Sequence, residues 1–280
     1  MIIPVEWTPI VVIAGKEFWD RIRNRWVLAI ALVFAVFALV IAYFGAAQQG
    51  TVGFRGMDVT IASLVSLVIY LTPLIALILG YDTIVGERER GSLELLLSLP
   101  ITPLELLLGK YLGLAGALTC STLAGFGLAG IALIWKLGGK AIAPYVGFMG
   151  SALLLGLVFL SIALLVSTLA RDRVRASGIA IALWFFYVLV YDLLLLGILV
   201  LSESRFNLSF FPILLFLNPA DLFRILNIFG LEEVRKFYGL ATIMPAGLAS
   251  PWLLSGAMVL WIIAPLSIAA WRFKSGVKSE

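Results

Sequence analysis

The sequence predicts an all-α integral membrane protein with six transmembrane helices. Hydrophobic residues make up 62% of the 280 residues and charged residues only 13%, whereas an ordinary soluble domain carries about 25% charge. Crossing about 30 Å of hydrocarbon takes roughly 20 apolar residues. Six segments are long and apolar enough: residues 27–47, 59–80, 111–134, 143–170, 176–201 and 251–271. About 26 residues precede the first apolar segment, so we expect a retained span there and no cleaved signal peptide.

The lysines and arginines between these spans are unevenly distributed. Thirteen lie on the side that holds the two termini and the 82–110 loop, and seven lie on the other side. Cytoplasmic loops carry the excess of positive charge. We therefore expect a multi-pass protein of the inner (cytoplasmic) membrane with both termini in the cytoplasm.

The cytoplasmic 82–110 segment contains a short, leucine-rich helix signal. Ser92 is the expected N-cap, Glu94 lies in the first turn, and Pro100 ends the helix because the residue before a proline is pushed out of the α region. An exposed apolar patch usually marks a binding surface, although the leucines could instead pack in the headgroup layer or on the chain's own helices. The leucines in question are Leu93, Leu95, Leu96, Leu97 and Leu99.

A second helix begins directly after this segment and continues into the third span. Thr102-Pro103-Leu104-Glu105 has the pattern of a capping box with proline at the first helical position. The third span is rich in glycine, and Gly109 and Gly113 have the four-residue spacing that lets two helix backbones approach closely. The sequence therefore predicts a long helix here with a tight helix–helix contact.

Residues 8–24, before the first span, have apolar side chains at helical spacing with basic residues mostly on other faces. This pattern indicates an amphipathic helix on the inner surface of the membrane. An ordinary basic flank that fixes topology is the other interpretation, and the two are compatible.

Residues 202–250, between the fifth and sixth spans, form the largest exterior segment and are too apolar for a disordered linker. Asn218 is the expected N-cap of a helix with Pro219 at its first position and Asp221 in its first turn, which Gly230 would close. A second helix is suggested by Val234, Phe237 and Tyr238. Such helices could re-enter the outer leaflet or form a docking surface.

Few ionisable groups are available for chemistry. The chain has no histidine and one cysteine, so a histidine-based triad, a histidine zinc site and a disulfide within one chain are excluded. It also has no phosphate-binding loop for ATP. Asp192 is the only ionisable acid or base within the six spans, and it is either a transport or gating residue or a hydrogen-bonded structural carboxyl.

The charged segment resembles the signature of ABC-2 type permeases, the six-span subunits of ATP-binding-cassette transporters. The residues that carry the likeness are Glu87-Arg-Glu-Arg-Gly-Ser-Leu-Glu94, Leu95-Leu-Leu-Ser-Leu-Pro100 and Glu105-Leu-Leu-Leu-Gly-Lys110. Within that family the chain is similar to the permeases of nitrous oxide reductase maturation systems. That likeness rests on Arg23-Asn-Arg-Trp26, Phe44-Gly-Ala-Ala47, Gly53-Phe54, Tyr81-Asp-Thr-Ile-Val-Gly-Glu87 and Leu217-Asn-Pro-Ala-Asp-Leu-Phe-Arg224.

The resemblance implies a homodimer that works with a separate, NosF-like ABC ATPase, in which ATP and Mg²⁺ bind, so the chain itself has no cofactor and is not an enzyme. It makes residues 8–24 the connecting helix and the leucine-rich helix the coupling helix. Glu87, Arg88, Glu89 and Arg90 are expected to steer and register the ATPase contact. The apolar area of the ATPase contact is expected to come from Leu93, Leu96 and Leu97. The shape of the coupling helix is expected to depend on Gly91, Ser92, Glu94 and Pro100.

For the exterior side, the resemblance implies a NosD-like periplasmic copper-handling partner and a role in delivering copper to the reductase. Asn218, Pro219, Asp221 and Arg224 are the residues expected to dock that partner. A metal site in the chain is not expected, although methionines such as Met57 and Met244 could still contact Cu(I). An exporter of an unidentified small molecule or sulfur species and a non-transporting membrane anchor are the alternatives.

Overall fold

The computed structural model describes residues 6–44, 57–139, 142–201, 211–228, 248 and 250–277. All regular secondary structure in these ranges is helical, and six helical segments within them are long and apolar enough to cross a membrane. The predicted fold class is therefore confirmed. The exterior helix expected around Val234 to Tyr238, and the predicted helix end at Gly230, lie outside the described residues.

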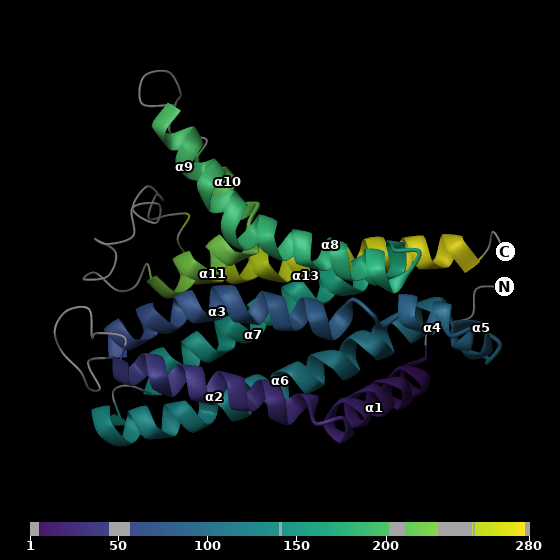
Figure 1. Ribbon diagram of the computed structural model, residues 1–280, viewed down its shortest axis with the longest axis horizontal. Helices are drawn as coiled ribbons and strands as arrows, with labels where there is room; N and C mark the ends of the chain where they lie inside the picture. Colours follow the sequence, from purple (N-terminus) through teal and green to yellow (C-terminus); the bar gives the residue numbers. More distant parts are fainter. Residues whose placement is uncertain are drawn as a thin grey trace.

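The six membrane-crossing segments form the body of the molecule. Five of them are continuous helices: α2 (Trp26–Phe44), α3 (Met57–Gly80), α6 (Pro103–Leu137), α7 (Ile142–Leu169) and α13 (Pro251–Val277). The remaining segment is built from α8 (Arg173–Phe185), the π-helical turn η3 (Phe186–Val190) and α9 (Tyr191–Leu201). Most of these helices run side by side along the long axis, whereas α9 leans away from the others (Figure 1).

Helix α7 is the centre of the core. In its most apolar stretch of 18 residues, 72% is buried inside the molecule. The helix packs against both α3 and α13. Its aromatic residues Phe148 and Phe159 are almost completely buried, and they contact rings from other helices. Such an all-round apolar helix is stable only inside a protein or a membrane, so the other spans assemble around α7.

Helix α1 (Trp7–Arg23) packs along the first half of α6, and the glycines of α6 allow this contact. A Cβ atom at Gly113 would lie 2.6 Å from the backbone oxygen of Ala14, and one at Gly109 would lie 2.7 Å from the side chain of Ile13. The close helix approach predicted from the glycine spacing is confirmed, and its partner is α1.

The two ends of the bundle carry exposed tryptophans. We call the end that holds α4 (Val85–Glu89) and α5 (Ser92–Leu97) the α5 end, and the opposite one, near α11 (Pro219–Ile228), the α11 end. Trp271 is exposed at the α5 end and Trp252 at the α11 end. Trp271 lies 19 positions after Trp252, a rise of about 28 Å at about 1.5 Å per residue, which is close to the hydrocarbon thickness. Exposed tryptophans at both ends match the aromatic belts of membrane proteins.

Candidate functional site

The leucine-rich helix exists, but its start differs from the prediction. Helix α5 begins at Ser92, and its N-cap is Gly91, whose φ of 70° is left-handed and therefore suits glycine. Ser92 instead donates a hydrogen bond to the Glu87 carbonyl at 3.3 Å. The predicted capping box of the next helix is confirmed: Glu105 N donates to Thr102 Oγ1 at 3.2 Å, and Thr102 N donates to Glu105 Oε2 at 2.6 Å.

The leucines of this helix divide into an inner and an outer group. Leu93 is buried at 7% exposure, and Leu96 and Leu97 are half-buried against the core. Leu95 and Leu99 are 71% and 52% exposed. The expectation that Leu93, Leu96 and Leu97 supply the free apolar area is therefore wrong for Leu93 and holds only partly for the other two. The larger apolar surface open to a partner belongs to Leu95 and Leu99.

The charged residues before α5 also make contacts within the chain. Arg88, Glu89 and Arg90 are nevertheless exposed, so their role in an ATPase contact stays a prediction. Arg88 Nη1 donates to the Ala170 carbonyl at 3.0 Å, and Arg90 Nε donates to the Gly86 carbonyl at 3.0 Å. Glu89 accepts a hydrogen bond from the backbone N–H of Arg173 at 2.8 Å. Arg88 and Glu89 therefore anchor α4 to the region between α7 and α8, whereas the Arg90 bond stays within α4.

Glu87 belongs to a buried ionic triad that the sequence reasoning missed. Lys110 Nζ lies 2.7 Å from a carboxylate oxygen of Glu17 and 2.7 Å from one of Glu87. The Lys110 side chain is only 2% exposed. Glu17 comes from α1, Glu87 from α4 and Lys110 from α6, so the triad joins three helices. The available sequence signal was Glu17 itself, which falls among the apolar positions of its helix.

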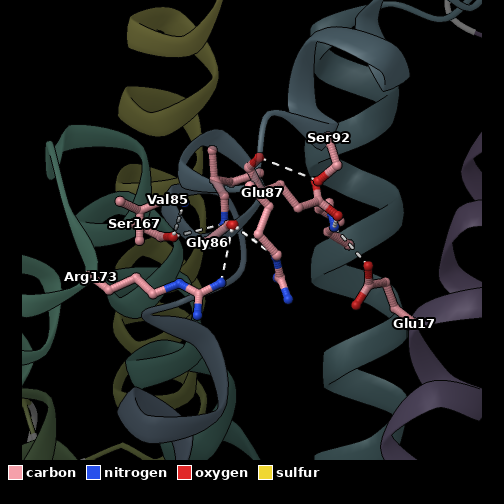
Figure 2. A network of polar contacts seen from close by, with 10 residues as sticks. Glu17, Val85, Gly86, Glu87, Ser92, Ser167 and Arg173 are labelled. Carbon is pink, nitrogen blue, oxygen red and sulfur yellow. Dashed lines mark hydrogen bonds and ion pairs between the residues drawn. The ribbon is translucent and has the colours of Figure 1, made fainter.

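A second set of contacts fixes α4 from the other side (Figure 2). Ser167 of α7 accepts hydrogen bonds from the N–H groups of Ile84 and Val85 at 2.8 and 3.1 Å. Arg173, at the start of α8, lies 2.8 Å from Asp82 and donates to the Gly86 carbonyl at 3.1 Å. Figure 2 shows Arg173 reaching towards Gly86 from one side and Glu17 approaching from the other. Helix α4 is thus bound directly to α6, α7 and α8, and it is linked to α1 through Lys110.

The polar residues of α11 form a buried cluster at the other end. Asn218 caps α11, because its side-chain oxygen accepts from Ala220 N at 3.0 Å, as predicted. Asn218 and Asp221 are 0% and 1% exposed, and Pro219 is also buried. The expectation that these three dock an exterior partner through their side chains is therefore wrong, because burial leaves them no surface to offer.

This cluster joins α11 to the π-helical turn of the fifth span. Arg224 lies 2.7 Å from Asp192 of α9 and 2.5 Å from Asp221. Asn218 Nδ2 donates to the carbonyl of Tyr187 in η3 at 3.0 Å. Burial raises the pKa of Asp221 to about 7, the Arg224 guanidinium opposes that rise, and the Asp192 carboxylate adds to it. Of the two interpretations of Asp192, the contacts show the hydrogen-bonded structural one; a transport or gating role stays a hypothesis.

Comparison with known proteins identifies the family. A model of the ABC-2 family transporter protein matches residues 11–276. The probable ABC transporter permease protein NosY of Pseudomonas aeruginosa is 46% identical over 277 residues, which cover 97% of this chain and 98% of that protein. The protein of the same name from Stutzerimonas stutzeri is 44% identical over 264 residues, with 92% and 95% covered. The chain therefore belongs to the ABC-2 family of transporter proteins and is a NosY-like permease component of an ABC transporter.

Proposed function

We propose that this permease couples ATP hydrolysis by a separate, NosF-like ATPase to the delivery of copper to nitrous oxide reductase on the exterior side of the inner membrane. In this proposal the protein is a homodimer with both termini and α5 in the cytoplasm. The exterior partner is a NosD-like periplasmic copper-handling protein. The support is the NosY-like sequence over nearly the whole chain and the motifs shared with permeases of reductase maturation systems.

The proposed ATPase contact is inferred from the contrast between the two faces of α5. Leu95 and Leu99 are exposed, while the helix base is fixed by the Lys110 triad and by the contacts of Ser167 and Arg173. An exposed apolar patch on a rigid support is suited to seating in a groove of a partner. Helix α5 is therefore the proposed coupling helix.

The same contacts suggest how movement reaches the exterior side. ATP-driven closure of two ATPases would draw two coupling helices together, and α4 would pass that displacement to α1, α6, α7 and α8 as packed rigid bodies. Helix α8 continues through η3 to α9, where Asp192 pairs with Arg224 of α11. The displacement of a cytoplasmic helix would thus shift α11 without any bound substrate in the chain.

On the exterior side the buried cluster positions α11, and partner contact belongs to its neighbours. Leu217, directly before Asn218, is 52% exposed, and Ile213 of α10 (Phe211–Phe216) is 51% exposed. These side chains lie next to the cluster in sequence and are open to a partner. Asn218, Pro219, Asp221 and Arg224 therefore act in docking indirectly, by fixing the segment that carries Leu217.

The proposal is tested by the copper content of nitrous oxide reductase in cells that lack the chain and are complemented with either the wild type or Leu95→Asp. Wild type should restore copper to the reductase and Leu95→Asp should not, although both should reach the membrane in equal amount. Normal copper content in the cells without the chain would reject the copper role and leave export of a small molecule or sulfur species, or a membrane anchor.

A further inference from the structure

A charged cavity of about 480 Å³ lies at the α5 end, between α1, the α3–α4 turn and the start of α6. Its wall includes Lys16 and Arg21 of α1, Asp82, Glu87 and Arg90 of the α4 region, and Lys110 of α6. Glu17, Glu87 and Lys110, the triad that links three helices, also line this cavity. A link between helices requires no open space beside it.

The charges of the wall do not balance one another locally. Among the residues that the structure describes, Lys16, Arg21 and Arg90 form no ion pair, whereas Asp82 is paired with Arg173. Three guanidinium or ammonium groups on the wall therefore have no carboxylate partner in the described ranges. Cations without a carboxylate partner at a membrane interface attract a phosphate-bearing headgroup.

The base of the cavity has the opposite sign. Lys110 shares its single positive charge between Glu17 and Glu87, which leaves the triad with a net charge of −1. Glu87 is 8% exposed, and its Oε2 atom is buried and has no hydrogen-bond partner within the described part of the chain. A buried carboxylate oxygen without a donor is costly, and a ligand with a primary ammonium group would supply that donor.

The cavity lies at headgroup level. Asp20, Arg23 and Asn24 also line it, and they stand between Trp19 and Trp26, which are 66% and 43% exposed. Tryptophans gather where hydrocarbon meets headgroups. Ile78, which is 43% exposed, lies near the end of α3, four residues before Asp82, so an exposed apolar side chain of the span is close in sequence to the cavity wall.

We propose that this cavity binds the headgroup of phosphatidylethanolamine, with its phosphate on Lys16, Arg21 and Arg90 and its ammonium on the free oxygen of Glu87. The phosphate accounts for the unpaired cations and the ammonium accounts for the unpaired carboxylate oxygen. Phosphatidylcholine lacks an N–H donor and phosphatidylglycerol lacks a cation. The site therefore discriminates among headgroups that share one phosphate.

The test is native mass spectrometry of the full chain in detergent, titrated with dihexanoyl phosphatidylethanolamine, phosphatidylcholine and phosphatidylglycerol, and with soluble phosphoethanolamine. The wild type should bind phosphatidylethanolamine about tenfold more tightly than phosphatidylcholine and phosphatidylglycerol, as expected when one charge-assisted hydrogen bond is gained. It should bind soluble phosphoethanolamine more weakly than phosphatidylethanolamine, because phosphoethanolamine has no acyl chains. Glu87→Gln should remove the preference over phosphatidylcholine. Arg21→Gln should weaken all three lipids, and Arg175→Gln, whose side chain pairs with Asp172 outside the cavity, should change nothing.

Equal affinity for the three lipids would overturn the proposal, and so would Arg21→Gln binding like the wild type. Equal binding of soluble phosphoethanolamine would assign the cavity to a small metabolite instead of a lipid. If Glu87→Gln does not fold, the headgroup preference of the wild type and the lipid affinity of Arg21→Gln still test the proposal. No ATPase is present in these titrations, so their outcome is separate from that of the coupling proposal.

Discussion

Replacing Lys110 tests whether the buried triad holds α1, α4 and α6 together. Lys110→Met keeps the length of the side chain and removes its charge. Glu17 and Glu87, each 2.7 Å from the lost ammonium, would then face each other as two buried carboxylates without a cation. Removing one partner of a buried ion pair costs about 3–5 kcal/mol, because the remaining charge is left uncompensated.

For a domain of this size, a loss of that magnitude corresponds to a fall in Tm on the order of 10 °C. The matched control is Arg175→Met. Arg175 pairs with Asp172 at 3.1 Å, but the two side chains are 62% and 39% exposed, so that change should cost less than about 1 kcal/mol. The triple variant Lys110→Met, Glu17→Gln, Glu87→Gln leaves no buried charge and should recover most of the loss.

The assay follows folded protein in detergent by size-exclusion chromatography after heating, at one scan rate, because membrane proteins often unfold irreversibly. We expect the order wild type, Arg175→Met, triple variant, Lys110→Met, from most to least stable. The reasoning is refuted if Lys110→Met is as stable as Arg175→Met, or if the triple variant is no better than Lys110→Met.

Two further predictions concern packing and pH. Gly113→Ala should lower Tm by several degrees because its Cβ would lie 2.6 Å from the Ala14 oxygen, whereas Gly127→Ala, with nothing within 4 Å, should not; equal Tm values would contradict the close contact with α1. Asp221 should make the protein less stable as pH rises. Its pKa is raised from 3.8 to about 7 in the folded state, so the folded protein keeps a proton that the unfolded chain loses between about pH 4 and 7. Asp221→Asn should flatten the fall in Tm across that window, and an unchanged slope would show that another group controls it.

Features of the fold with strong local signals were predictable. Six apolar segments, the capping box at Thr102 and Glu105, and the cap at Asn218 all follow from residues close in sequence. The close approach at Gly113 was also predictable, because only small residues allow it. Its partner was not, since glycine spacing does not name the second helix.

The candidate site was less predictable because its residues meet over long sequence separations. Glu17 and Lys110 are 93 residues apart and touch only when α1 lies along α6. Leucine runs show that a helix is apolar, but which leucines are free depends on the neighbouring helices, as Leu93 and Leu95 demonstrate. Similarly, the position of Asp221 in the first turn of a helix predicts a carboxylate at the surface. Only the packing of α11 shows that this carboxylate is buried.

The proposed role of α5 is tested most directly by what remains bound to the chain. The measurement is mass spectrometry of proteins co-purified with C-terminally tagged wild type, Leu95→Asp and Val174→Asp, the last a matched change at an 81% exposed residue of α8. We predict an ABC ATPase with the wild type and Val174→Asp and its loss from Leu95→Asp, while an exterior copper-handling protein is retained by all three. An ATPase bound equally to Leu95→Asp and the wild type would contradict the assignment of α5 as the coupling helix.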